Sequence, residues 1–354
     1  MTAYRRLLGI ALALTAVVVV FGAYVRLADA GLGCPDWPGC YGKLSPHHAA
    51  AAIADAHAVD PHGPVSLPKA WKEMIHRYLA AFLGLLIVAI AALAWRHRRH
   101  REAAPGIALA LVGVVVFQGL LGKWTVTLLL KPAIVTAHLL GGLTTFALLV
   151  WLGLRARGVR RETVDRPLAL AARVGLGLLV VQIALGGWTS TNYAALACTD
   201  FPACHGSLWP PADYANAFHV VRELGMTADG ELLPLAALTA IHWSHRVGAV
   251  VVGIVLFALG AGLVRRPASA WRGVALIAAL LLQIGLGIAN VLLSLPLPLA
   301  AAHNAGAALL VGVLVWINYC ARAARPRHTE HGARAALHAG ARTAAAITER
   351  RAQT

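Results

Sequence analysis

The sequence predicts an all-α membrane protein whose eight transmembrane helices form two tandem four-helix bundles, with the N and C termini in the cytoplasm. Its 354 residues are 59% hydrophobic and only 13% charged, and the mean hydropathy is +0.68. Eight apolar stretches approach or exceed the ~20 residues that a helix needs to cross a bilayer. The second half of the chain also repeats the first. This composition excludes an ordinary soluble enzyme.

The apolar stretches set the predicted helices, which are 7–25, 72–94, 106–128, 133–154, 168–190, 234–264, 271–293 and 299–320. The first stretch has some features of a signal peptide, because Arg5 and Arg6 precede it and small residues follow it. The repeat argues against cleavage. Residues 21–34 and 185–198 are matching blocks that each run from a helix end into a cysteine loop. We therefore expect the first helix to be retained.

The repeat is visible as one ordered set of residues that occurs twice. Cys34, Cys40, His76, Arg77, Gln118 and His138 recur as Cys198, Cys204, His245, Arg246, Gln283 and His303, at offsets between 164 and 169 residues. Four spans per repeat give both halves the same orientation, so a pseudo-twofold axis along the membrane normal is expected. We assign residues 1–165 and 166–321 to the two bundles and 322–354 to a cytoplasmic tail without assigned chemistry.

The net charge of +16 reflects membrane topology and not nucleic-acid binding. Arginines cluster at one set of helix ends and in the tail, within 5–6, 96–101, 155–161, 265–272 and 322–351. The positive-inside rule places these clusters in the cytoplasm. The long loops 34–71 and 192–233 then lie outside, which for a bacterial inner-membrane protein means the periplasm.

Four histidines near the outer helix ends are the candidate ligands. His76 and His138 belong to the first bundle, and His245 and His303 to the second, at comparable depth. Two imidazoles from facing helices can hold a haem iron from both sides. A single membrane histidine would more often make an interhelical hydrogen bond. Four at repeat-related positions favour two haem sites.

Arginines directly follow two of these histidines. Arg77 and Arg246 are placed to pair with haem propionates that point towards water. Interfacial arginines that extend their charge to the membrane surface are the alternative explanation.

The halves differ at the position three residues before the first histidine. Glu73 precedes His76 there, whereas His242 precedes His245. Residues three apart share a helix face, so Glu73 is predicted to serve the first site as a proton-handling group. One site would carry out chemistry and the other would hold a fixed redox cofactor. An interfacial anion near Lys69, Lys72 or Arg77 is the alternative.

Four of the five cysteines form two Cys-x5-Cys pairs in the outer loops. Disulfides persist outside the cytoplasm, so Cys34–Cys40 and Cys198–Cys204 are predicted bridges, with metal binding as the weaker alternative. Cys320 is expected to be a packed thiol. The histidine-rich insertion 45–65 and His242 receive no predicted role.

Together these motifs resemble the haem A synthase family over about residues 7 to 320. The resemblance implies that haem O is the substrate and that its C8 methyl group is oxidised to the formyl group of haem A. It implies substrate binding at His76 and His138 with help from Glu73, and a resident haem b at His245 and His303. It links the first cysteine pair to activity or haem handling and the second to structure.

The implied partners are a haem O synthase as supplier, an electron-transfer partner and the lipid bilayer. A homo-oligomer is compatible with the sequence, and nucleic acid is not an expected partner. Two other functions use the same histidines: a di-haem b-type electron carrier or quinol oxidoreductase, and a haem transporter or chaperone. A prenyltransferase is disfavoured because the sequence has no paired Asp-rich motif for magnesium diphosphate.

Overall fold

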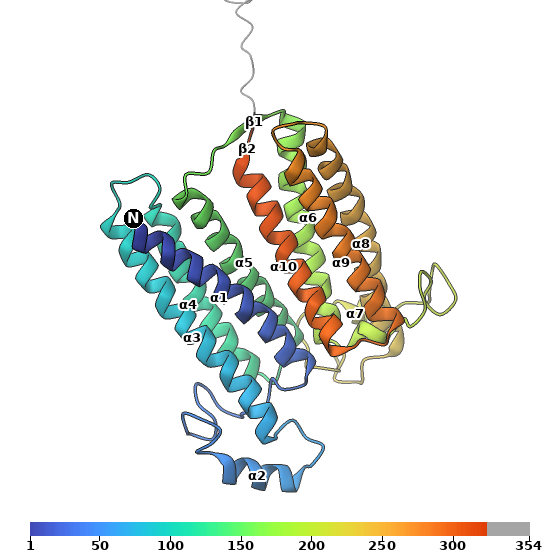
Figure 1. Ribbon diagram of the computed structural model, residues 1–354. Helices are drawn as coiled ribbons and strands as arrows, with labels where there is room; N and C mark the ends of the chain where they lie inside the picture. Colours follow the sequence, from blue (N-terminus) through green and yellow to red (C-terminus); the bar gives the residue numbers. More distant parts are fainter. Residues whose placement is uncertain (324–354) are drawn as a thin grey trace, which may run out of the picture.

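Eight long apolar helices form the body of the protein (Figure 1). The computed structural model describes residues 1–323. The helices long enough to cross a membrane contain 23 to 30 residues and are α1 (Thr2–Leu27), α3 (Leu67–Arg96), α4 (Pro105–Thr127), α5 (Pro132–Ala156), α6 (Arg166–Thr191), α8 (Leu235–Val264), α9 (Ala270–Leu292) and α10 (Leu297–Cys320). The predicted eight-span membrane protein is confirmed.

Predicted and observed helix ends differ by no more than five residues. The largest differences are at the starts of α1 and α3, where the helix continues beyond the predicted stretch through segments that contain Arg5 and Arg6, or Lys69. Several helices begin with a proline in their first turn, where its missing N–H costs no hydrogen bond; these prolines are Pro68, Pro105, Pro132, Pro167 and Pro298. Helix starts could therefore be located from sequence better than hydropathy alone allows.

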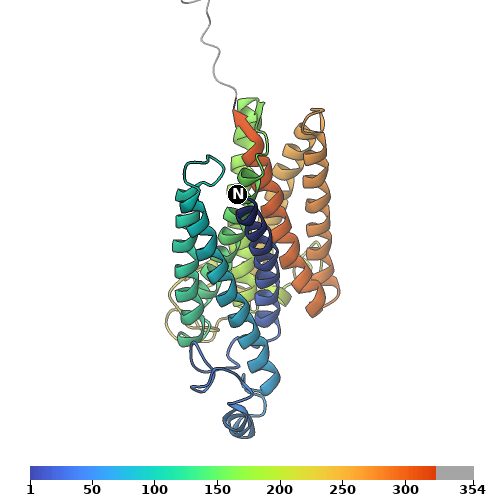
Figure 2. The ribbon, with the colours of Figure 1, turned by 60° about the vertical axis from the view of Figure 1, so that its left-hand side comes forward.

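Each half of the chain closes a ring of four helices. In the first half α1 packs on α3, α3 on α4, α4 on α5 and α5 on α1. In the second half the same order holds for α6, α8, α9 and α10. The rings meet where α10 packs on α1 and α5, and where α5 packs on α6 (Figure 2). The packing partners in the two halves therefore correspond one to one.

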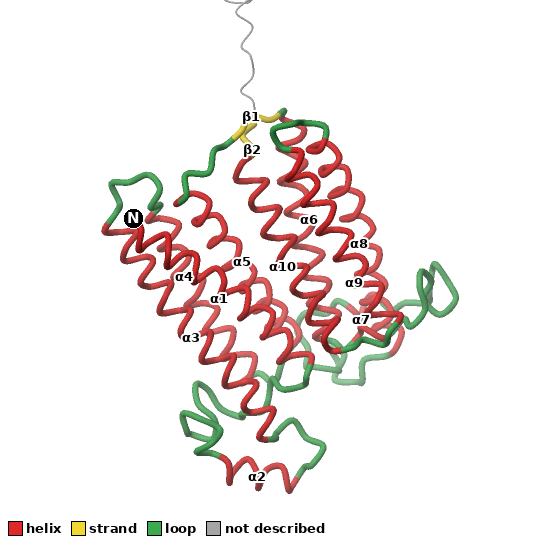
Figure 3. Tube along the Cα trace, viewed as in Figure 1, coloured by secondary structure: helices red, strands yellow, loops and turns green. Residues whose placement is uncertain are grey.

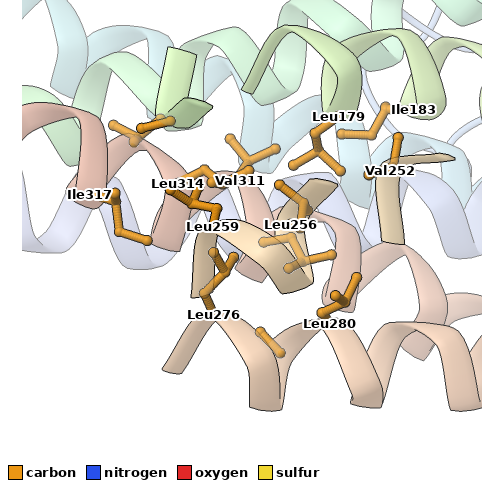
Figure 4. Packing of buried hydrophobic residues seen from close by; sticks show 14 of the residues in the cluster. Leu179, Ile183, Val252, Leu256, Leu259, Leu276, Leu280, Val311, Leu314 and Ile317 are labelled. Atoms are coloured by element: carbon orange, nitrogen blue, oxygen red, sulfur yellow. The ribbon is translucent and has the colours of Figure 1, made fainter. Parts of the chain in front are cut away.

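The buried core is aliphatic and is divided between the two rings. One cluster joins α1, α3, α4 and α5 around Leu8, Ile87 and Leu111. The other joins the second ring around Leu256 and Leu314 (Figure 4) and also includes Leu143 of α5. This second cluster thus extends across the boundary between the halves, so the halves share packed apolar surface.

Short elements lie at the two ends of the helices (Figure 3). The first outer loop carries α2 (Ala50–Val59), and the second carries the 3₁₀ turn η1 (Ala194–Leu196) and α7 (Tyr214–Ala217). We call the end that carries α2 and α7 the loop end. The N terminus lies at the opposite end, as do β1 (Glu162–Val164) and β2 (Ala321–Ala323) (Figure 1).

The two strands are a departure from the predicted all-α fold. β1 and β2 pair in parallel, with Glu162 opposite Ala321, so the link between the halves is fastened to the end of α10. Strands of three residues carry no periodic pattern that a sequence could reveal. The tail from residue 324 onward, to which no chemistry was assigned, lies outside the described residues.

Candidate functional site

The four predicted ligand histidines lie within the first three turns of their helices, counted from the loop end. His76 is on α3, His138 on α5, His245 on α8 and His303 on α10. At 1.5 Å per residue this places them on the order of 9 to 15 Å along each helix. All four side chains are partly exposed. The histidines therefore occupy matched positions in the two rings.

In the first ring, each imidazole packs against a glycine of the neighbouring helix. A Cβ added to Gly22 of α1 would lie 2.7 Å from His76 Cε1, and one added to Gly122 of α4 would lie 3.3 Å from His138 Cε1. Because glycine has no side chain, both imidazoles can lie close to the backbone of the neighbouring helix.

The second ring repeats this arrangement. A Cβ on Gly186 of α6 would lie 3.0 Å from His245 Cε1, and one on Gly287 of α9 would lie 3.1 Å from His303 Cε1. The same helix-to-helix geometry thus supports both histidine pairs.

The imidazole nitrogens of these histidines are suited to a bound ligand. Nδ1 is buried and without a hydrogen-bond partner among the described residues in His76, His138 and His303. Buried polar atoms in native proteins are nearly always paired, so such orphans indicate a missing partner. Imidazoles with unpartnered nitrogens on two helices of one bundle are suitable ligands for a haem iron, since histidine is its usual axial ligand.

Glu73 is buried and bound to the first cysteine loop. Its Oε2 accepts a hydrogen bond of 3.0 Å from the backbone N–H of Cys34, and its Oε1 pairs with Arg77. Arg77 Nη1 donates to the backbone oxygens of Asp36 and Gly39, at 2.9 and 2.5 Å. Glu73, one turn before His76, and Arg77, directly after it, therefore anchor the loop beside this histidine.

Arg246 and His242 make the corresponding contacts in the second half. The backbone N–H of Cys198 donates to His242 Nδ1 at 3.3 Å. Arg246 donates to the backbone oxygens of Cys198, Asp200 and Ala203 at 2.7 to 2.8 Å. His242 is thus the counterpart of Glu73 as a loop anchor.

Both predicted disulfides are present. Cys34–Cys40 and Cys198–Cys204 each have Cα atoms 4.9 Å apart, and Cys320 is a buried free thiol, as expected. Each loop contains one cis peptide before a proline, at Trp37–Pro38 and Phe201–Pro202. The insertion without a predicted role packs here, because Ile53 of α2 joins the cluster around the first cysteine pair.

An aspartate closes each cysteine loop through backbone hydrogen bonds. Asp36 accepts from the N–H groups of Tyr41 and Gly42, both at 2.7 Å. Asp200 accepts from those of His205 and Gly206, both at 2.8 Å. The hydrogen bond from Gly206 is the main reason that the pKa of Asp200 lies below its usual range. The two cysteine loops therefore share this aspartate contact as well.

Two groups at the site escaped prediction. Gly22 corresponds to Gly186 at the 164-residue offset of the matching blocks, which was the available signal, but its contact with His76 depends on the packing of α1 against α3. Gln182, on α6, lies 3.0 Å through Nε2 from Nδ1 of His245. A lone glutamine in an apolar helix, one turn before Gly186, was the available signal. Gln118, noted as part of the repeat, donates to the backbone oxygen of His138 at 2.8 Å.

Comparison with known proteins gives consistent matches over most of the chain. A family model described as cytochrome oxidase assembly protein matches residues 5–315. A protein of Shewanella oneidensis named haem A synthase is 43% identical over 316 residues, which are 88% of this chain and 95% of that protein. A protein of the same name from Erythrobacter litoralis is 28% identical over 91% of this chain and 98% of its own length.

Proposed function

This chain belongs to the cytochrome oxidase assembly protein family, and we propose that it is a haem A synthase, an oxidoreductase that converts the C8 methyl group of haem O into the formyl group of haem A. Haem O is then the substrate and haem A the product. Conversion of a methyl into a formyl group removes four electrons from the carbon in successive steps. Such chemistry belongs to a cofactor that the protein binds and orients.

The repeated histidine pairs are the observation that carries this proposal. Each ring holds two imidazoles against bare glycine backbone, and three of the four Nδ1 atoms have no hydrogen-bond partner within the described part of the chain. We assign haem O to His76 and His138, and a resident haem b to His245 and His303. When bound, haem b supplies a one-electron redox centre. Glu73 supports the assignment, because only the first half has a carboxylate beside its histidine.

Glu73 is placed to handle a proton during turnover. Its carboxylate is 5% exposed, lies one helical turn from His76 and is held by Arg77 and the Cys34 N–H. A carboxylate fixed in this way can accept a proton at Oε1 or Oε2 without losing its place. The role of Arg77 and Arg246 as propionate partners stays a prediction, since both guanidiniums already bind loop carbonyls.

We further propose that the loop end faces the periplasm of a bacterial cell. Eight apolar spans make the chain a multi-pass membrane protein. Both disulfides lie at the end opposite the N terminus, and disulfides persist in oxidising compartments. A haem O synthase in the same membrane would supply so apolar a substrate, and a separate partner would accept electrons.

Haem extraction tests the proposal. Membranes from cells that express this chain with a haem O supply should contain haem A by chromatography, and the purified protein should carry haem b together with haem O or haem A. A di-haem electron carrier would yield haem b alone. A haem transporter would lose pigment equally when His138 or His303 is replaced by alanine. Absence of haem A from the membranes would overturn the proposal.

A further inference from the structure

We infer that Gln182 is a positioning residue for His245, and that it distinguishes the second haem site from the first. The inference rests on the proposed binding of haem b by His245 and His303. Gln182 Nε2 lies 3.0 Å from His245 Nδ1 and donates to the backbone oxygen of His245 at 2.9 Å. One amide thus holds both the ring and the backbone of the same residue, which restricts rotation of the imidazole.

The other three histidines lack this contact. Their buried Nδ1 atoms have no hydrogen-bond partner within residues 1–323; these histidines are His76, His138 and His303. Gln118 reaches only the backbone of His138. Gln283 lies 3.3 Å from the other ring nitrogen of His303, Nε2. Among the residues that the structure describes, only the Nδ1 of His245 has a partner in this set of four.

Gly248 provides the space for the Gln182 amide. A Cβ added to Gly248 would collide with Gln182 Oε1. At the offsets of the repeat, 164 residues on the first helix and 169 on the second, the first half has Val18 and Leu79 instead. The amide and its glycine are therefore replaced together by two apolar side chains. A change at both contacting positions indicates that the contact belongs to the second site specifically.

If His245 binds iron, the Gln182 amide would act as its hydrogen-bond partner. An imidazole that binds iron through Nε2 carries its proton on Nδ1, and the acceptor of that proton fixes the ring and raises its basicity. Gln182 Oε1 is buried without a partner in the described part of the chain. Turning the amide over exchanges the two contacts that Nε2 makes here for one hydrogen bond from Nδ1–H to Oε1. A more basic imidazole favours ferric over ferrous iron, so this contact should lower the midpoint potential of haem b.

Two variants test the inference by spectroelectrochemical titration of the purified protein. Gln182→Leu removes the amide, and Gly248→Ala displaces it while leaving it in the chain. Both should raise the midpoint potential of haem b and lower its retention during purification. Loss of an outer-shell partner of this kind costs about 10- to 100-fold in metal affinity. A tenfold loss confined to the ferric state corresponds to about 59 mV.

Gly253→Ala on the same helix is the matched control, because a Cβ there makes only an ordinary contact of 3.8 Å with Ile284. It should leave the potential unchanged. If Gln182→Leu does not accumulate in the membrane, the midpoint potential of Gly248→Ala alone tests the inference. Potentials of both variants equal to that of Gly253→Ala would overturn the inference. Absence of haem b from the unaltered protein would instead overturn the proposed function.

Discussion

Glu73 is the residue at which the chemistry of the two halves diverges. It anchors the first cysteine loop as His242 anchors the second, but only the carboxylate can carry a negative charge to the site. We predict that Glu73→Ala stops formation of haem A and retains haem b, since general acid–base groups contribute roughly 10²- to 10⁴-fold to rate. Haem extraction with quantitation of haem A and haem b provides the measurement.

The variant Glu73→Gln separates the two roles of this side chain. Glutamine keeps an oxygen for the Cys34 N–H but cannot handle a proton in the same way. We expect it to keep the loop closed and to remain inactive. Activity close to that of the unaltered protein in Glu73→Gln would mean that Glu73 acts only by holding the loop.

His303 should be indispensable for the resident haem. Its imidazole packs against Gly287, and its buried Nδ1 has no hydrogen-bond partner among the described residues. His303→Ala is expected to remove haem b from the purified protein, as seen in its absorption spectrum. His138→Ala is the matched change in the first ring and should leave haem b in place. Loss of haem b from both variants would argue against separate sites.

At the scale of single residues, the sequence could identify functional candidates that occur once in each half of the chain. His76, His245 and the cysteines stand at repeat-related positions, so they were found. The partners of Arg77 could not be predicted, because they are backbone oxygens of a loop whose path depends on its turns. Gln182 was missed for the same reason: only the packed structure shows that it faces His245.

Helix α1 contributes to the first histidine site, although the histidine His76 lies on α3. Gly22 brings the backbone of α1 against His76. We predict that Gly22→Ala displaces the imidazole and lowers the haem O and haem A content of the purified protein about tenfold, with haem b unchanged. Gly113→Ala is the control, because a Cβ at Gly113 meets nothing within 4 Å. Equal haem contents in both variants would contradict this role of α1.

The second cysteine loop should open in acid. The pKa of Asp200 is held below its usual range by the Gly206 N–H, so the carboxylate stabilises the folded loop above the ordinary aspartate pKa. That contribution disappears as the pH falls through the lowered value. We expect phosphine reduction of Cys198–Cys204 to be slow at pH 7 and faster well below about pH 4.

Asp200→Ala should make this reduction fast at pH 7, because the N–H groups of His205 and Gly206 lose their acceptor. Asp229→Ala changes an exposed aspartate of the same long loop and should behave like the unaltered protein. A reduction rate at pH 7 that is the same for Asp200→Ala and Asp229→Ala would show that the carboxylate does not hold the loop.

Elements were predictable in proportion to their length. A long helix such as α8 contains 30 mostly apolar residues, a pattern that a short loop does not produce. In contrast, β1 and β2 each have three residues, and each is a strand because it pairs with the other. α2 buries only Ile53, so its ten residues carry almost no amphipathic pattern.

At the scale of the whole molecule, the rings are joined by shared apolar packing and by a polar clamp at the loop end. Tyr193, after α6, donates to Asp29 Oδ1, after α1, at 2.8 Å. Lys131 and Glu223 form an ion pair of 2.7 Å between loops of different halves. Burial raises the pKa of the Tyr193 hydroxyl, so it remains a donor over the physiological range.

Arg26 is the centre of this clamp, and its loss should weaken the union of the halves. Its Nη2 donates to the backbone oxygen of Ser190 at 3.0 Å, and its guanidinium lies 4.2 Å from the ring centroid of Tyr193. Hydrogen bonds from charged groups contribute about 1.5 to 3 kcal/mol. Arg26→Met keeps the apolar stem and removes these contacts, so the apparent Tm in detergent should fall by a few degrees.

Lys131→Met is the control for that change. Lys131 pairs with Glu223 between the same halves, but the glutamate side chain is 60% exposed, and exposed pairs contribute only about 0 to 1 kcal/mol. The apparent Tm of Lys131→Met should therefore stay close to that of the unaltered protein in differential scanning fluorimetry. If Arg26→Met melts at the same temperature as Lys131→Met, the apolar contacts of α10 with α1 and α5 hold the halves together without help from the clamp.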